Sequence, residues 1–220
     1  MPTDTRSNAA RNEILNRIRA ANGIQHGQVV PTGAWEAMER SYRRHGSLSR
    51  DGVLELFEHR LRDYDSGFVR VSAASVPQTV ASLLAARGIQ RVVIPSGLNA
   101  QWLPSGIEYL EDDGLTAEEL DQVDGVMTGA SVAIAETGTV ILQNVSGQGR
   151  RMITLVPDYH LCVVLAEDVV ETVSQAMERL QRTADVATTF VSGPSATADI
   201  EMTRIKGVHG PRSLDVVLID

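Results

Sequence analysis

The segment of residues 128–142, TGASVAIAETGTVIL, holds a single charged side chain, Glu136, among apolar and small residues. A lone carboxylate in this setting can act as a nucleophile, as a general base, or as a binder of a ligand hydroxyl or amine. The same group also accepts backbone N–H bonds at a turn and holds neighbouring loops together. Composition gives the two interpretations equal weight, so Glu136 is the candidate catalytic residue with a structural alternative.

Small and hydroxylated residues surround this carboxylate. Gly138 permits a sharp turn and the close approach of a ligand, because it has no Cβ atom. Threonine hydroxyls can donate or accept a hydrogen bond to a ligand. The binding residues expected around the carboxylate are Thr128, Gly129, Thr137 and Gly138.

Two arginines follow a glycine-rich turn in SGQGRR, residues 146–151. Backbone N–H groups and the guanidinium groups of Arg150 and Arg151 can together grip an anion. The alternative, which the shortness of the motif favours, is a hairpin turn with solvated charges. The segment lacks the strand-to-helix setting of a phosphate-binding loop.

A second turn, SGPSATADIE at residues 192–201, follows a predicted strand and leads towards a predicted helix. Ligands commonly sit beyond the carboxyl end of a strand in an α/β sheet, and a helix N-terminus there favours an anion. Ser195, Thr197 and Asp199 are therefore candidate binding residues, with ordinary helix capping as the alternative. Asp199 argues against a bound phosphate unless a cation balances it.

Histidine in a loop can transfer protons near neutral pH, and His209 in GVHGP is such a residue. Its alternative role, a hydrogen bond to backbone, is the more common one. His160 borders a strand and is interpreted as a residue at the edge of the core. No histidine and carboxylate share a metal-ligand spacing, so we expect no metal.

The elements that position these residues follow from periodicity. Apolar residues at helical spacing predict a helix over 7–22, followed by a polar arm to residue 50. The next helix, over 51–65, places Val53, Leu54, Phe57 and Leu61 on one face, with Asp51 as its cap. A strand at 68–72, a helix at 76–88 and a strand at 91–96 form a βαβ unit.

The pattern continues towards the carboxyl end. A strand over 107–112 precedes a short helix at 116–122 with a capping box. Three apolar runs in 123–144 predict strand, turn, short helix and strand. The remaining predictions are a strand at 160–166, a helix at 167–182, and strands at 188–192 and 214–220. Near-continuous apolar strands indicate an α/β fold whose sheet is covered by helices on both faces.

Composition excludes several classes of partner. The 20 basic and 28 acidic residues give a net charge of −8, so no general attraction to nucleic acid or to anionic lipid is expected. No stretch approaches the roughly 20 apolar residues that span a bilayer, and no apolar secretory core follows the start. A cytoplasmic protein is the expectation. Cys162, the single cysteine, cannot alone hold an iron–sulfur cluster with thiolates.

Three segments resemble the LUD-domain family of the lactate utilisation protein C type. They are MTGASVAIAETGTVIL (127–142), GQGRRMITLVPDYHLCVV (147–164) and SGPSATADIEMTRIKGVHGPRSLDVVLI (192–219). The resemblance covers residues 65–220. It implies a Rossmann-like three-layer α/β/α sandwich of the NagB/RpiA/CoA transferase-like type. Together with the polar composition before residue 50, the expected division is a helical arm over 1–50 and the α/β domain over 51–220.

The resemblance also implies a role in growth on L-lactate. In such systems lactate is oxidised to pyruvate with three proteins, of which two carry iron–sulfur motifs and the C-type member carries none. The single cysteine agrees with that division. CoA transferases of this fold group use a glutamate two residues before a glycine, the form of Glu136-Thr137-Gly138. By analogy, these residues and the loop from Ser195 to Asp199 line a shared cleft.

Three functions remain open. The first is an accessory or substrate-binding subunit of a lactate-oxidising system, with iron–sulfur partner proteins, a small carboxylate or other anionic ligand, and no cofactor of its own. The second is an acyl- or phosphoryl-group transferase that uses Glu136, and the third is a small-molecule sensor. The aromatic and basic arm, with Trp35, Tyr42 and Arg43, is a candidate contact for a homo-oligomer.

Overall fold

The structure is a computed structural model that describes residues 5–21, 33, 37–197, 205–206 and 210–220. Its contacts divide the chain into two compact units, residues 1–42 and residues 43–220. In the first unit, α1 (Thr5–Ala21) confirms the predicted first helix. Its apolar residues Ile14 and Ile18 are exposed.

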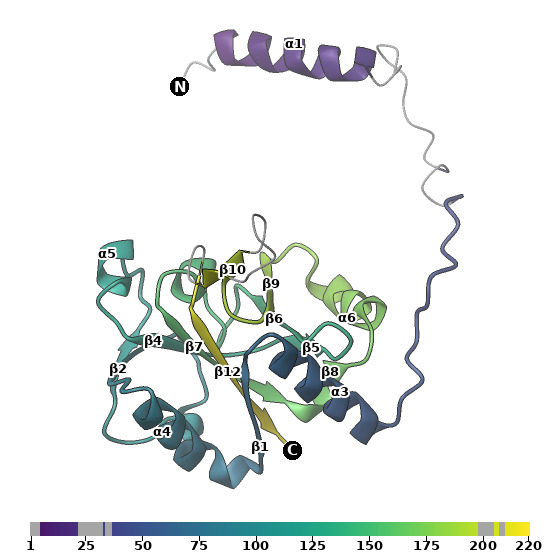
Figure 1. Cartoon of the computed structure of the whole chain (residues 1–220). Coiled ribbons are helices and arrows are strands. Elements are labelled where there is room, and N and C mark those ends of the chain that lie inside the picture. Colours follow the sequence, from purple (N-terminus) through teal and green to yellow (C-terminus); the bar gives the residue numbers. More distant parts are fainter. Residues whose placement is uncertain (1–4, 22–32, 34–36, 198–204, 207–209) are drawn as a thin grey trace. The chain divides into compact units, whose positions relative to one another are not determined.

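The second unit is built on a six-stranded sheet in which every pair of neighbours is parallel (Figure 1). The strand order is β1-β12-β7-β4-β2-β3. The strands are β1 (Gly67–Val71), β2 (Arg91–Ile94), β3 (Glu108–Glu111), β4 (Gly125–Gly129), β7 (Tyr159–Leu165) and β12 (Ser213–Ile219). This arrangement, with helices packed against it, is the predicted Rossmann-like α/β fold.

Alternation along the central strands divides their side chains between two cores. In β7, Leu161 and Val163 pack with α4 (Val76–Ala86), whereas Cys162 and Val164 pack with α3 (Arg50–Asp63). Strand β12 divides its residues in the same way. Because successive side chains of a strand point to opposite faces, α4 and α3 cover opposite faces of the sheet.

A second sheet shares the α3 face. Its order is β8-β5-β6-β9, from β5 (Val132–Ile134), β6 (Thr139–Gln143), β8 (Val169–Val170) and β9 (Thr188–Ser192). Ala133 and Val140 pack into the core under α3. Ile134 and Ile141 point the other way and pack with α6 (Val173–Leu180). The small sheet thus forms a layer between the main sheet and α6.

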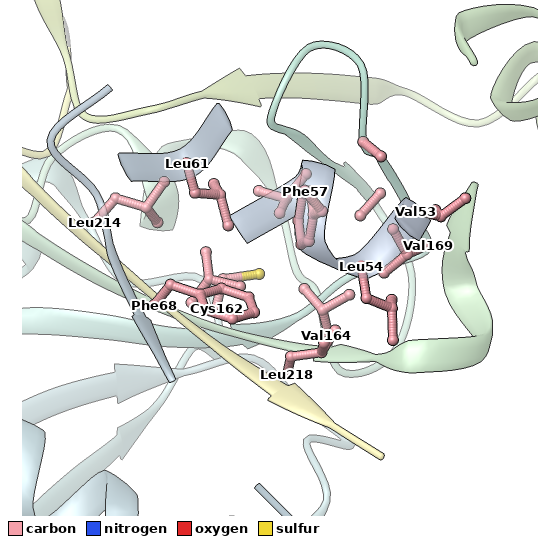
Figure 2. Packing of buried hydrophobic residues seen from close by; sticks show 14 of the residues in the cluster. Val53, Leu54, Phe57, Leu61, Phe68, Cys162, Val164, Val169, Leu214 and Leu218 are labelled. Atoms are coloured by element: carbon pink, nitrogen blue, oxygen red, sulfur yellow. The ribbon is translucent and has the colours of Figure 1, made fainter. Parts of the chain in front are cut away.

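The core under α3 is the junction of the two sheets. Leu54, Phe57 and Leu61 come from the predicted apolar face of this helix, and Figure 2 shows them over Phe68 and Cys162. Phe57 meets Phe68 edge to face, with ring centroids 6.2 Å apart. Aromatic pairs favour this geometry.

The cap of α3 differs from the prediction. The side chain of Ser49 accepts a hydrogen bond from the backbone N–H of Gly52, and Asp51 lies in the first turn. Serine is as good a cap as aspartate, and its position one residue before the helix decides the start. The negative charge of Asp51 still interacts favourably with the positive, amino-terminal end of the helix dipole.

Short elements complete the unit. The capping box of Thr116 and Glu119 forms as predicted at the start of α5 (Ala117–Leu120). The short 3-10 turns are η1 (Ala73–Ser75), η2 (Ala100–Trp102), η3 (Arg151–Thr154), η4 (Ala166–Asp168) and η5 (Gln181–Thr183). A small hairpin pairs β10 (Ala196–Thr197) with β11 (Ile205–Lys206).

Two predicted helical stretches are strands. The short helix expected within 123–144 is absent, because β5 and β6 form an antiparallel hairpin there. The helix expected from residue 167 begins only at Val173, after a capping box at Thr172. Val169 and Val170 pair in parallel with Ala133 and Ile134, so pairing to another strand overrides their helical spacing.

A polar cluster around a buried carboxylate fastens α4 to the main sheet. Arg87, at the end of α4, makes two hydrogen bonds of 2.8 and 2.7 Å to the buried carboxylate of Asp215 in β12. Tyr159 donates its hydroxyl to the same carboxylate at 2.8 Å. Burial, together with the charge of Asp215, raises the pKa of Tyr159 far above its usual value.

Within the described residues, no helix is both long enough and apolar enough to cross a membrane.

Truncation of Phe57 tests whether the α3 core holds the two sheets together. Phe57→Ala should lower the free energy of unfolding by about 3–5 kcal/mol, because it removes a fully buried ring and leaves a cavity. Urea denaturation followed by circular dichroism measures the change. Met177→Ala on α6 is the control, because Met177 is 49% exposed, and should cost less than about 1 kcal/mol. Equal losses in the two variants would contradict this role for α3.

Candidate functional site

A cavity of about 280 Å³ opens between the main sheet, β9 and η3. It lies over the amino-terminal ends of β7 and β12, on the face that also carries α3. The cavity is lined by Arg151, Thr154, His160, Phe190, Val191, Ser192, Gly193, Pro194, Ser195, Gly210, Pro211 and Leu214. Within this set no side chain is acidic, and arginine is the only residue that is ionised at every physiological pH.

His160 forms part of the cavity wall and is 1% exposed. It is the second residue of β7 and lies on the same face as Cys162, two residues later. Its Nε2 lies 2.8 Å from the hydroxyl oxygen of Thr128, which is fully buried in the adjacent strand β4. This buried pair satisfies a polar group that would otherwise be costly on an apolar sheet face.

The ring of His160 is neutral in the folded protein. Burial, with a smaller contribution from the nearby charge of Arg151, lowers the pKa of His160 to about 3. A neutral imidazole has one N–H donor and one nitrogen acceptor. His160 can therefore offer a directional hydrogen bond to a ligand without adding charge.

Cys162 joins His160 and Thr128 in a buried row of polar side chains. The Thr128 hydroxyl lies 3.8 Å from its Sγ, and that Sγ lies 3.7 Å from the carbonyl oxygen of Gly129. Burial raises the pKa of the Cys162 thiol to about 12, so the thiol stays protonated. A protonated thiol is neither a nucleophile nor a metal ligand, and Cys162 here serves as a weak hydrogen-bonding group.

Arg151 brings the positive charge to the mouth of the cavity. It begins η3 and is exposed. One guanidinium nitrogen donates to the carbonyl and hydroxyl oxygens of Thr154 at 2.9 and 3.0 Å. Desolvation lowers the pKa of Arg151, which still stays charged at neutral pH. No ion pair of Arg151 is formed with any part of the chain that the structure describes.

A row of hydroxyls leads away from the cavity. The Ser192 hydroxyl lies 2.7 Å from that of Thr139, which lies 2.7 Å from that of Thr137. Ser192 lines the cavity and Thr137 lies in the turn after Glu136. The predicted binding residue Thr137 is thus connected to the cavity but does not line it.

Glu136 lies in the turn between β5 and β6, outside the cavity lining. Its carboxylate pairs with the guanidinium of Arg43. Another nitrogen of that guanidinium, Nη1, lies 3.5 Å from Oε1 of Glu171. The backbone N–H of Glu136 donates to the carbonyl of Glu171 at 3.0 Å. These contacts match the alternative in which the residue holds neighbouring segments together.

Glu171 is the more buried partner of Arg43, with 5% of its side chain exposed. It accepts a hydrogen bond of 2.8 Å from the backbone N–H of Leu48. That bond is the main reason why the pKa of Glu171 is lowered. Arg43, Glu136 and Glu171 together fasten the segment before α3 to the small sheet.

Gly138 adopts a positive φ of 57°, which confirms the predicted sharp turn. A Cβ atom there would lie 2.9 Å from the backbone of Arg60. The close approach that requires glycine is therefore made by α3. Any larger residue at this position would push the helix away from the β5–β6 turn.

The paired arginines of SGQGRR have separate partners. Arg150 makes two hydrogen bonds of 2.8 Å to Asp112 and a further one to the carbonyl of Leu115. It therefore grips a carboxylate of its own chain at the end of β3, whereas Arg151 reaches the cavity. Gly129 is bonded through its N–H to the carbonyl of Gly147, which holds this loop beside β4.

The second predicted loop contributes in part. Ser195 lines the cavity, and its backbone N–H donates to Pro211 at 2.8 Å. Residues 196 and 197 form a strand of the β10–β11 hairpin rather than a helix start. The preceding strand β9 belongs to the small sheet, where it pairs antiparallel with β6, so the loop does not follow a strand of the parallel sheet. Asp199 and His209 lie outside the described residues.

The structure thus brings Arg151, Ser195 and Thr128 to one place and leaves Glu136, Gly138 and Arg150 in two others. Sequence reasoning missed Thr154 and Ser192 and left His160 at the core edge. Alternation along residues 159–165 was the available signal, because it places His160 on the same face as Cys162. No cluster of three or more potential metal ligands occurs among the described residues.

Comparison with known proteins identifies the family. The family model described as LUD domain matches residues 7–219. The chain belongs to the LUD domain family. This LUD domain is 43% identical over 213 residues to a protein of Deinococcus radiodurans named lactate utilization protein C, covering 96% of this chain and 95% of that protein.

A second relative and a solved structure also match this chain. A lactate utilization protein C of Oceanobacillus iheyensis is 26% identical over 241 residues, covering 97% of this chain and 96% of that protein. A crystal structure of a DUF162 family protein from Deinococcus radiodurans, at 1.70 Å resolution, matches with a TM-score of 0.70 and 40% identity. The match covers 79% of this chain and 100% of that chain.

The neutral state of His160 predicts a specific acid sensitivity. The unfolded chain binds a proton at His160 below about pH 6.5, whereas the folded protein does not until about pH 3. Stability should therefore fall by about 1.4 kcal/mol per pH unit from this residue as pH drops from 6 to 4. Urea denaturation of the wild type and of His160→Gln over this range measures the difference in slope.

His59→Gln is the matched control, because His59 is exposed on α3. It should keep the acid slope of the wild type, whereas His160→Gln should flatten it. An unchanged slope in His160→Gln would show that His160 titrates normally in the folded protein.

Proposed function

We propose that this chain is a component of a lactate utilisation system, in which it binds a small anionic metabolite and leaves electron transfer to iron–sulfur partner proteins. The observation that carries the proposal is the near full-length similarity to the Deinococcus radiodurans protein named lactate utilization protein C. The likeness extends over both the cavity and the segment before α3, so it supports a shared role rather than a shared fold alone.

The chemistry of the cavity supports a binding role. Arg151 supplies the positive charge for an anion, and the neutral ring of His160 supplies a directional hydrogen bond. The cavity volume of about 280 Å³ is close to the lower limit of roughly 300 Å³ for small-molecule sites. It therefore suits a small metabolite better than a nucleotide or an acyl-CoA.

The cysteine content supports the assignment of electron transfer to partner proteins rather than to this chain. Iron–sulfur clusters are held by thiolates, and the single cysteine of this chain is buried with its pKa raised to about 12. Partner proteins with their own cluster ligands are the proposed site of electron transfer. A group-transfer role for Glu136 has less support, because its carboxylate pairs with Arg43 outside the cavity.

Deletion of the gene in its own organism tests the role in lactate utilisation. The deletion strain should fail to grow with L-lactate as the sole carbon source and should grow normally on glucose. Restoring the wild-type gene should restore growth on lactate. Normal growth of the deletion strain on L-lactate would overturn the proposal.

Affinity purification tests the partners. The tagged chain, isolated from lactate-grown cells, should carry with it proteins rich in cysteine whose absorbance and iron content reveal iron–sulfur clusters. The destabilised Phe57→Ala variant is the control that tests whether the partners bind the folded protein. The amount of partner protein that it retains should fall in proportion to its folded fraction. A chain that is isolated alone would contradict the partner assignment and leave the growth phenotype to be explained otherwise.

A further inference from the structure

The buried row behind the cavity has a direction. It ends at the carbonyl oxygen of Gly129, which can only accept, so the Cys162 thiol 3.7 Å away is the donor. The Thr128 hydroxyl donates to the Cys162 sulfur at 3.8 Å. With its proton on the sulfur, the Thr128 oxygen receives Nε2–H of His160 across the 2.8 Å contact, whereas the other tautomer of His160 would accept the Thr128 proton at Nε2.

The 2.8 Å contact is compatible with either tautomer of His160, and the inference below rests on the one with its proton on Nε2. In a neutral imidazole, a proton on Nε2 leaves Nδ1 as an acceptor. No hydrogen bond joins Nδ1 to any residue that the structure describes. Among the described residues, Nδ1 of His160 is not one of the fully buried side-chain atoms that lack a partner. Because His160 lines the cavity, the lone pair of Nδ1 is an acceptor that a ligand can satisfy.

Such an acceptor distinguishes between ligands. A hydroxyl group donates its proton to Nδ1, whereas an oxo group presents only lone pairs to it and a methylene presents nothing. A site built around a buried hydrogen-bonding group discriminates strongly against analogues that lack the matching group. The His160 side of the cavity therefore favours an alcohol.

The other groups of the cavity define the rest of the ligand. The guanidinium of Arg151 suits a carboxylate, and among the described residues that line the cavity no acidic side chain competes for it. The apolar side chains of Val191 and Leu214 give a short alkyl substituent a place away from water. Ser192 adds a hydroxyl to the cavity wall, 2.7 Å from the hydroxyl of Thr139.

We infer that the cavity is a binding site for a small 2-hydroxycarboxylate, with the carboxylate on Arg151 and the 2-hydroxyl donating to Nδ1 of His160. The inference rests on the proposed function and names the class of ligand at its site. L-lactate is the simplest member of the class. In this arrangement Thr128 is a positioning residue, because it sets the tautomer without touching the ligand.

Isothermal titration of the purified full chain with sodium L-lactate tests the site, with sodium chloride at equal ionic strength as the blank. Lactate should bind at least about tenfold more tightly than propionate, which lacks the hydroxyl, and than pyruvate, which has an oxo group. Equal affinity for the three acids, or no binding of lactate, would overturn the inference.

Variants separate the two contacts. Arg151→Gln should weaken lactate binding about tenfold or more, because it removes a charged hydrogen-bond donor. Arg212→Gln is the matched control, since Arg212 lies next to the cavity residue Pro211 but outside the lining, and it should bind as the wild type does. Loss of binding in both variants, or in neither, would contradict the assignment of Arg151.

Thr128→Val tests the tautomer without removing a ligand contact. This variant should lose the preference for lactate over pyruvate while retaining a dependence on Arg151. An unchanged preference in folded Thr128→Val, verified by its circular dichroism spectrum, would overturn the assigned role of Nδ1.

The growth experiment tests the proposed function and the binding experiments test the ligand, so either claim can be overturned without the other. A chain that is required for growth on L-lactate but binds no hydroxycarboxylate overturns the ligand assignment and leaves the proposed function standing. A chain that binds lactate through Arg151 but is dispensable for growth overturns the proposed function and leaves the site standing.

Discussion

The short link between β4 and β5 constrains the whole second unit. Only Ala130 and Ser131 separate the end of a central strand of the main sheet from the first strand of the small sheet. The chain must therefore continue directly over the face on which Cys162 and Val164 lie, and α3 packs into the same core. Where the small sheet ends at β9, the cavity remains open above His160. The site is thus a consequence of how two sheets share one face.

Local patterns predicted the elements whose own residues decide their structure. The apolar face of α3 was correctly predicted because all four of its core residues lie within one helix. The capping box at Thr116 was correct for the same reason. The strand at Val169 and Val170 was missed, because its partner is β5, more than 30 residues away. Helical spacing cannot reveal a pairing that depends on a distant strand.

The candidate site was predictable only in part. Arg151 and Ser195 were found because glycine-rich and proline-containing turns mark loops that bind ligands. Glu136 drew attention as a lone charge, but its partner Arg43 lies 93 residues earlier and gives no local signal. His160 was underrated because its meaning depends on the Thr128 hydroxyl of the adjacent strand and on the charge of Arg151. A buried polar pair is recognised only when strand register is known.

The central claim is that His160 is a neutral residue with its proton on Nε2, held by Thr128 at the wall of the cavity. Nitrogen-15 NMR of the histidine-labelled protein tests it most directly, with the His160 signals assigned among the five histidines by their loss in His160→Gln. The account predicts a protonated Nε2 and an unprotonated Nδ1 throughout pH 5–8, where the ring stays neutral because its pKa is lowered to about 3. A ring that titrates near its ordinary pKa, or that carries its proton on Nδ1, would contradict the account.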